Sequence, residues 1–169
     1  MFELMISLGA VVALVGAWGL YQTHRGRGGL RELMDRASDP AAVPPETAVP
    51  VDSDLVRRLY ATREWRETEQ LLSPDFVLVL PDGRRAGAQA LEESTAIMET
   101  YYVNPHATVE AIYADFELPS VLYVRDVARM QPLRGKPFDA RAWTRLVVAP
   151  CGTRIRELGP TNITTEAAS

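Results

Sequence analysis

Asp126 is the residue best placed for acid–base chemistry, because it interrupts an otherwise apolar strand face. In the segment Val121–Met130, alternate residues form one side of a strand. These residues are Leu122, Val124, Asp126, Ala128 and Met130. Burial among such neighbours raises the pKa of a carboxyl group and makes it a candidate general acid or base. An ion pair with Arg141, Arg145 or another arginine at the sheet edge is the structural alternative for this side chain.

His106 is the second candidate for acid–base chemistry. It begins a predicted strand after an Asn-Pro pair and could form a dyad with Asp75 or Asp126. The alternative is a solvated histidine at a strand edge. Two histidines and one cysteine give no ligand spacing for a metal. Because phosphate-loop and nucleophile motifs are also absent from the sequence, we expect neither a metal nor a cofactor.

Composition indicates one globular domain with an appendage. The chain has 169 residues, of which 47% are hydrophobic and 24% are charged. A formal net charge of -4 gives no indication of a basic surface that would bind nucleic acid. Cys151 is the single cysteine, so no intrachain disulfide framework can form. Lys136 is the single lysine among 18 basic residues, an arginine bias typical of GC-rich bacterial genomes.

The amino-terminal residues 1–23 are predicted to form a single-pass membrane anchor. Leu4–Tyr21 contains 18 residues without a charge, and as a helix it would span about 27 Å. A cleaved signal peptide or a buried core helix is the alternative, but Glu3 is the only charged side chain before this run. Four arginines follow it: Arg25, Arg27, Arg31 and Arg36. The positive-inside rule therefore predicts that the rest of the chain is cytoplasmic and bound to the cell membrane through residues 4–21.

Residues 24–52 are predicted to link the anchor to the domain. The first part is basic, and residues 38–52 hold four prolines with almost no large apolar side chain. Proline-rich chain of this kind extends by ~3.1 Å per residue. We therefore expect a spacer that holds the domain away from the membrane.

The remaining pattern predicts an α+β domain. Asp52 or Ser53 is the expected N-cap of a first helix, and short helical periods follow near Trp65–Leu72 and from Gly87 to about Tyr102. The expected strands are Phe76–Leu80, His106–Phe116, Val121–Met130, Phe138–Val148 and Arg154–Leu158. Helices first and strands afterwards predict a curved antiparallel sheet with helices packed on one face.

Two stretches carry a family resemblance, SPDFVLVLPDGRRAGAQAL and RIREL. In this order, after a Trp-containing helix, they resemble the SnoaL-like, nuclear transport factor two-like superfamily across residues 53–160, which leaves residues 161–169 as a C-terminal tail. The resemblance implies a cone-shaped α+β fold in which three N-terminal helices pack on the concave face of the sheet. It also implies a pocket between them and, often, a dimer through the convex face. Members include steroid isomerases, polyketide cyclases, dehydratases and non-catalytic binding modules.

Strand alternation assigns residues to the two faces of this expected sheet. The residues expected to line the pocket are Tyr60, Trp65, Leu80, Met98, Tyr101, Leu122, Val124, Ala142, Thr144 and Leu146. Trp143 falls on the convex face with Arg141 and Arg145, the composition of an interface anchor for a homodimer. A surface tryptophan covered by arginine stems is the alternative.

The resemblance argues against the isomerase reaction itself. In the isomerases a base aspartate precedes the proline of the first-strand turn, where this chain has Leu80. The place of their donor acid falls on Thr144, and that of their tyrosine falls on Leu59, beside Tyr60. The first hypothesis is therefore a membrane-tethered, non-catalytic module that binds a partner protein or a small apolar ligand.

The alternative hypothesis is an isomerase, dehydratase or cyclase. It would act on a hydrophobic small molecule, with Asp126 or His106 as the acid or base. A buried Asp126 within hydrogen-bond reach of His106 or a tyrosine hydroxyl would favour this enzyme. An exposed or arginine-clamped Asp126 would count against it.

Overall fold

The structure is a computed structural model that describes residues 39–80, 83–103, 106–134 and 136–167. For residues 97–101, 106 and 167 it describes the backbone alone. The predicted anchor and the basic segment after it lie outside the described residues. Within the described ranges, no helix is both long and apolar enough to cross a membrane.

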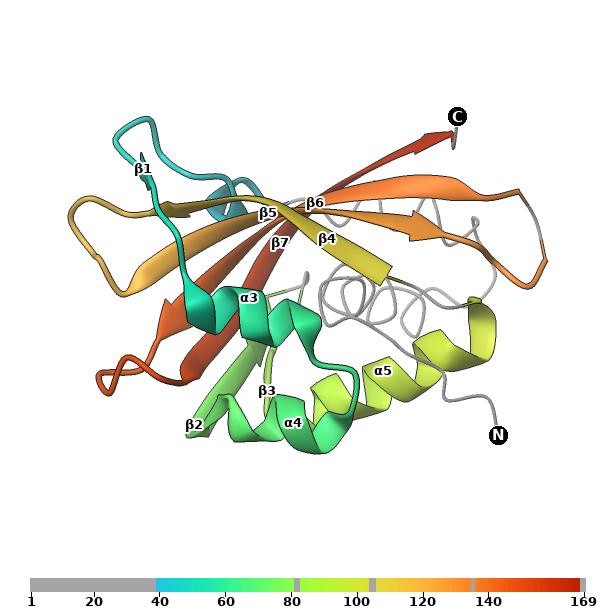
Figure 1. The fold of residues 1–169 in the computed structure, drawn as a ribbon, viewed down its shortest axis with the longest axis horizontal. Coiled ribbons are helices and arrows are strands. Elements are labelled where there is room, and N and C mark those ends of the chain that lie inside the picture. The colour runs from blue at the N-terminus through green and yellow to red at the C-terminus, as the bar shows by residue number, and fades with distance from the viewer. Residues whose placement is uncertain (1–38, 81–82, 104–105, 135, 168–169) are drawn as a thin grey trace.

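The domain is an α+β structure in which the three α-helices lie on one side of a sheet (Figure 1). The helices are the 3-10 helix η1 (Pro40–Ala42) and the α-helices α3 (Asp54–Ala61), α4 (Trp65–Gln70) and α5 (Ala88–Tyr101). The strands are β1 (Val49–Pro50), β2 (Leu72–Val79), β3 (Arg85–Ala86), β4 (His106–Ala114), β5 (Val121–Met130), β6 (Phe138–Val148) and β7 (Ile155–Ala167). The α+β class and the bounds of β5 and β6 are as predicted.

The sheet is mixed, so the prediction of a wholly antiparallel sheet is wrong. Its seven strands are ordered β1-β4-β5-β6-β7-β2-β3. β2 runs parallel to β7, with Leu78 opposite Leu158, while the other neighbouring strands are antiparallel. Because β2 and β7 are far apart along the chain, no hairpin fixes their relative direction.

β7 is much longer than predicted. The strand expected to end at Leu158 continues to Ala167 and pairs with β6 along this extension, with Ala142 opposite Ile163. Residues 161–167 therefore belong to the sheet and are not a tail. Their alternation of buried and less buried positions matches a strand with one face on the core.

The proline-rich segment from residue 39 onward is not a free spacer. The Asp39 N–H donates a 2.9 Å hydrogen bond to the carbonyl of Thr161, and Ala42 of η1 is completely buried. Val49 and Pro50 then pair with the edge of β4. A proline is tolerated here because an edge strand leaves one row of its N–H positions unused. We call residues 39–50 the N-terminal arm.

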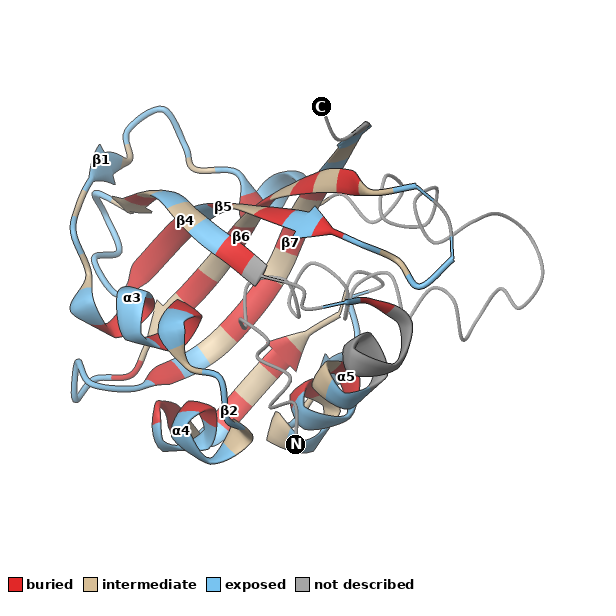
Figure 2. Ribbon diagram, turned by 45° about the vertical axis from the view of Figure 1, so that its right-hand side comes forward, coloured by how far each residue is buried: buried red, intermediate tan, exposed pale blue. Residues whose placement is uncertain are grey.

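The core lies between the sheet and the helices (Figure 2). Along β6 every second residue from Phe138 to Leu146 is buried, which confirms the predicted inward set of this strand. α3 begins at the expected N-cap, because the Ser53 hydroxyl accepts a 3.3 Å hydrogen bond from the N–H of Val56. It packs Leu55, Val56, Leu59 and Tyr60 into the core.

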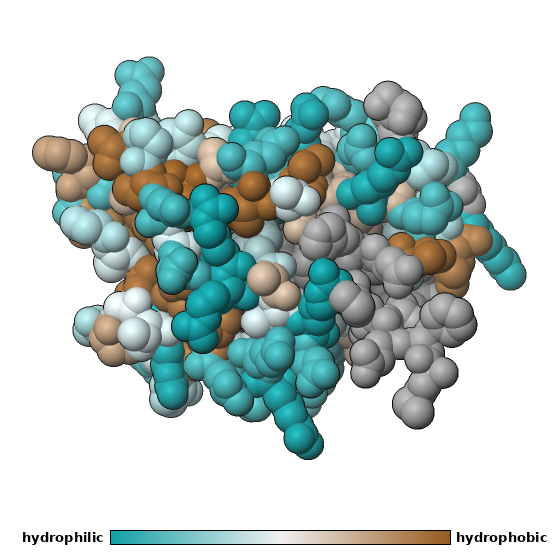
Figure 3. Space-filling view, viewed as in Figure 1, coloured by the Kyte–Doolittle hydropathy of each residue, from teal (hydrophilic) through white to brown (hydrophobic). Residues whose placement is uncertain are grey.

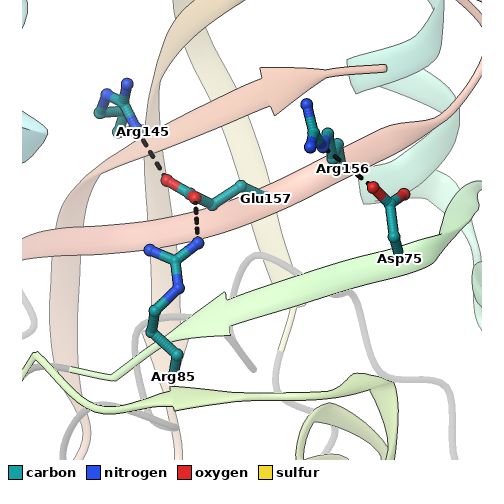
Figure 4. A network of polar contacts seen from close by, with 5 residues as sticks. All are labelled: Asp75, Arg85, Arg145, Arg156 and Glu157. Atoms are coloured by element: carbon teal, nitrogen blue, oxygen red, sulfur yellow. Dashed lines mark hydrogen bonds and ion pairs between the residues drawn. The ribbon is translucent and has the colours of Figure 1, made fainter.

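Ion pairs join the strands on the side of the sheet shown in Figure 4. Glu157 on β7 accepts a 2.7 Å bond from Arg85 on β3 and a 2.9 Å bond from Arg145 on β6. On β2, Asp75 lies 3.1 Å from Arg156 of β7. Arg145, predicted at an interface, therefore takes part in a contact that holds neighbouring strands together.

At Gly159 the backbone of β7 lies close to Val79 of β2, which gives a test of this packing. Its φ is +93°, and a Cβ atom there would lie 2.5 Å from the Val79 carbonyl oxygen. Gly152 also has a positive φ, +73°, but nothing lies within 4 Å of its Cβ position. We expect Gly152→Ala to lower the free energy of unfolding by about 1–2 kcal/mol, and Gly159→Ala to lower it by about 3 kcal/mol or more, because the clash adds to the backbone strain. Urea denaturation measures both losses, and equal losses would contradict the close approach.

Candidate functional site

Asp126 is buried in the middle of the sheet and bonded to a tyrosine. It lies on the inward face of β5, opposite Ala142 of β6, and is fully inaccessible to solvent. The hydroxyl of Tyr60 donates a 2.9 Å hydrogen bond to its Oδ2. Tyr60 comes from α3, whose buried face brings the phenol down onto the sheet. Packing of α3 thus brings a hydrogen-bond donor to Asp126, the buried carboxyl group among the described residues.

Burial controls the charge state of this pair. It raises the pKa of Asp126 to about 8, although the hydrogen bond from Tyr60 opposes the shift, and the charge of Glu110 adds to it. Burial, followed by the neighbouring Asp126, also raises the pKa of Tyr60 well above its usual range. At neutral pH the carboxyl group is therefore mostly protonated, with a minor ionised fraction. Such a group can both donate and accept a proton.

Two buried oxygen atoms beside this pair have no hydrogen-bond partner among the described residues. They are Oδ1 of Asp126 and Oγ1 of Thr144, which is itself fully buried on β6. The Thr144 hydroxyl is near enough to Tyr60 to oppose part of the rise in its pKa, but no well-formed hydrogen bond joins them. Each unsatisfied buried group costs about 1–3 kcal/mol. Asp126, Tyr60 and Thr144 together form the candidate site.

The ion-pair alternative for Asp126 is not realised. Arg141 projects from the opposite face of β6 and lies 3.5 Å from Glu166, and Arg145 is bound to Glu157. Among the described residues, the Asp126 carboxyl group is bonded to Tyr60 and not to an arginine. A buried Asp126 that is bonded to a tyrosine hydroxyl, and not to an arginine, is the arrangement that favours an acid–base role for this residue.

The described residues do not test the predicted dyads with His106. Asp75 is exposed, where the Ser73 hydroxyl and then Arg156 lower its pKa. The backbone of His106 pairs with Arg129 at the start of β4, but the imidazole lies outside the described side chains. Its proposed pairing with Asp126 stays a prediction.

The other predicted pocket residues lie in or against the core. Leu122, Val124, Ala142 and Leu146 are buried, and Trp65 and Leu80 pack against the core while partly exposed. The side chains of Met98 and Tyr101 lie outside the described residues. That these residues line a ligand pocket stays a prediction. Among the described residues, no group of histidine, cysteine and carboxylate side chains is arranged to hold a metal ion.

Sequence reasoning missed part of the outer face of the sheet. Trp143 and Arg141 lie on that face as predicted, but there they adjoin Asn162, Thr164 and Glu166 of β7. Those three residues were assigned to a tail. The β-branched residues at every second position, Thr161, Ile163 and Thr165, are the signal that could have extended the strand.

Comparisons with known proteins concern the fold. No family model matches the chain, and no curated protein matches it. Among solved structures, it is similar to PrhC from Penicillium brasilianum NBRC 6234, with 10% identity, coverage of 61% of this chain and 70% of that chain, and a TM-score of 0.50. A conserved protein from Planctomyces limnophilus DSM 3776 gives 15% identity, 61% and 83% coverage, and a TM-score of 0.41. The likeness to PrhC is a likeness of fold alone.

The raised pKa of Asp126 predicts an unusual pH dependence of stability. The unfolded carboxyl group ionises near pH ~4, but the folded one ionises near 8. Between these values the folded state holds a proton that the unfolded state has lost, so stability falls as pH rises, by at most about 1.4 kcal/mol per pH unit. Asp126→Asn should remove this slope in urea denaturation measured from pH 5 to 8.

Asp75→Asn is the matched control for this prediction. The pKa of Asp75 is lowered and its side chain is exposed, so any stability that it contributes is lost only at more acidic pH. We expect this variant to keep the slope of the parent protein. A slope that is unchanged in Asp126→Asn would show that Asp126 is ionised in the folded protein at neutral pH.

Proposed function

We propose that this domain is an enzyme of isomerase, dehydratase or cyclase type that acts on a hydrophobic small molecule. The supporting observation is the carboxyl group of Asp126, which is completely buried and bonded to Tyr60 through one oxygen while the other oxygen has no partner among the described residues. Catalytic acids and bases need a pKa near the working pH, and burial moves this group to about 8. A carboxyl group retained only for structure would be expected to satisfy both of its oxygens.

The proposed chemistry is proton transfer at carbon. In its ionised form, Asp126 removes a proton through Oδ1 from a carbon next to a substrate carbonyl, and it returns that proton to another carbon of the same molecule. The hydroxyl of Thr144 donates to the oxygen on which negative charge develops. Tyr60 positions the carboxyl group by its bond to Oδ2 and stabilises its ionised form. The cycle is balanced, because the proton removed is the proton returned.

The surroundings favour an apolar substrate. Leu122, Val124 and Ala142 are buried near the candidate site, and the core around it contains no charged group besides Asp126 among the described residues. Figure 3 shows apolar side chains at the surface on the left half of this face, among hydrophilic ones, and a smaller apolar area at its right edge. A charged substrate would lose its hydration at this site without compensation.

A second candidate is binding of a small apolar ligand without turnover. Leu80 stands where the resemblance places the isomerase base, and it is packed against the core. With a protonated Asp126 and Thr144 as hydrogen-bond donors, the same site can hold a carbonyl or phenol oxygen without transferring a proton. The two candidates share a ligand class and differ in whether the ionised form of Asp126 reacts.

The proposed location is the cytoplasmic side of the cell membrane, with residues 4–21 as the anchor. Support comes from the uncharged run of that segment and from the arginines that follow it. A hydrophobic substrate that partitions into the bilayer would be concentrated next to a domain held there.

Proton transfer is tested with a β,γ-unsaturated cyclic ketone, 3-cyclohexen-1-one, whose conversion to the conjugated isomer is followed by ultraviolet absorbance. We expect activity to rise with pH through about 8, as Asp126 ionises. Asp126→Asn should lower kcat by at least about 100-fold. Tyr60→Phe should move the pH profile upward, because its hydrogen bond lowers the pKa of Asp126. Asp75→Asn should change nothing.

Binding of 2-naphthol, a phenol that resembles an enol, separates the two candidates. Binding that is weakened by Asp126→Asn and Thr144→Val, without turnover of the ketone, would support the non-catalytic candidate. If these substitutions changed neither the turnover of the ketone nor the binding of 2-naphthol, the proposed site would be wrong.

The location is tested by labelling Cys151, the single cysteine of the chain, whose side chain is exposed. A membrane-impermeant maleimide should leave it unmodified in intact cells and modify it after permeabilisation. Cys151→Ser should remain unlabelled in both cases. Labelling in intact cells would place the domain outside and overturn the proposed topology.

A further inference from the structure

The outer face of the sheet carries a hollow of about 340 Å³ on the side away from the three α-helices. We call it the outer groove. Its lining residues are Val43, Arg125, Arg141, Ala142, Trp143, Asn162, Thr164 and Glu166. The volume falls at the lower end of the range of small-molecule pockets. Apart from Ala142, which is buried opposite Asp126, none of these residues takes part in the proposed acid–base chemistry.

Strand register brings the lining residues together in two rows. Arg125, Trp143 and Asn162 stand opposite one another on β5, β6 and β7, and Arg141 and Thr164 form the next row on β6 and β7. The N-terminal arm contributes Val43 to the lining. Because the rows lie on regular strands, the spacing of these side chains is fixed by the sheet.

Arg141 lines the outer groove and has one unsatisfied donor. Its Nε is buried and has no acceptor among the described residues. Its Nη1 lies 3.5 Å from Glu166, and both side chains are partly exposed, so this ion pair is weak. The edge of a guanidinium group that carries Nε binds a planar carboxylate through two parallel hydrogen bonds. A carboxylate is thus the group that would satisfy the unused hydrogen-bond donor of Arg141.

Trp143 gives the outer groove a flat aromatic wall. The guanidinium carbon of Arg125 lies 5.8 Å from the centre of the indole ring, and the ring of Tyr113 lies 5.8 Å away at a tilt of 57°. Arg125 is also held by Glu110 at 3.1 Å. A rigid aromatic surface of this kind favours an aryl ring as ligand.

We propose that the outer groove binds a small aryl carboxylate, with its carboxylate on Arg141 and its ring against Trp143. Asn162 and Thr164 offer additional polar contacts on the same side of the sheet. Glu166 competes with the ligand for Arg141, because it is the acid nearest to that guanidinium group. The groove is separate from the candidate acid–base site, since Arg125 and Asp126 are adjacent in β5 and face opposite sides of the sheet.

Calorimetric titration of the full chain with 2-naphthoate tests this site. Arg141→Gln should weaken binding by about 10- to 100-fold, the loss expected for a charge-assisted hydrogen bond. Arg145→Gln is the matched control on the same strand, and it should leave binding unchanged because Arg145 is bound to Glu157 and does not line the groove. Glu166→Gln should tighten binding, since it frees Arg141. The neutral analogue 2-naphthamide should bind at least about 10-fold more weakly than 2-naphthoate.

Three results would overturn the proposal. The first is the absence of 2-naphthoate binding up to millimolar concentration in protein that is folded by circular dichroism. The second is an equal loss of affinity in Arg141→Gln and Arg145→Gln. The third is a dimer in sedimentation that dissociates on substitution of Trp143 and excludes 2-naphthoate, because the outer face would then be an interface between copies of this chain.

Discussion

Ten residue pairs join β5 to β6 without a break, from Val121 opposite Val147 to Met130 opposite Phe138. Because side chains alternate across a sheet, this register decides which residues meet the helices and which face outward. A slip of one residue would turn Asp126 outward and bring Arg125 and its neighbours into the core. The apolar alternation of both strands makes such a slip costly. The position of every candidate functional group on these strands depends on it.

Much of the fold follows from this alternation and could be predicted from the sequence. The bounds of β5 and β6, the inward set around Asp126 and the N-cap at Ser53 are all local signals, and the structure contains them. Contacts between distant segments could not be predicted in the same way. Tyr60 and Asp126 are 66 residues apart, and their bond depends on how α3 docks on the sheet. The parallel pairing of β2 with β7 has the same long-range origin.

The two faces of the central strands differ in physical character. On the inner face, polar atoms are few, buried and partly unsatisfied, so each one matters energetically. The outer face carries guanidinium groups and carboxylates in contact with water, where individual ion pairs contribute little. A site on the inner face gains selectivity from exclusion of water, whereas one on the outer face depends on shape and on a few directed hydrogen bonds.

The N-terminal arm changes the mechanical relation between this domain and whatever precedes it. If the 15 residues 38–52 formed a free, extended proline-rich linker, it would be roughly 46 Å long. In the structure the segment is not free to extend in this way. Its backbone is hydrogen-bonded to β7 at Asp39, and β1 pairs with the edge of β4. Tension arriving through the chain would therefore be received on the outer face of the sheet. The candidate acid–base site lies on the other face, shielded from such a load.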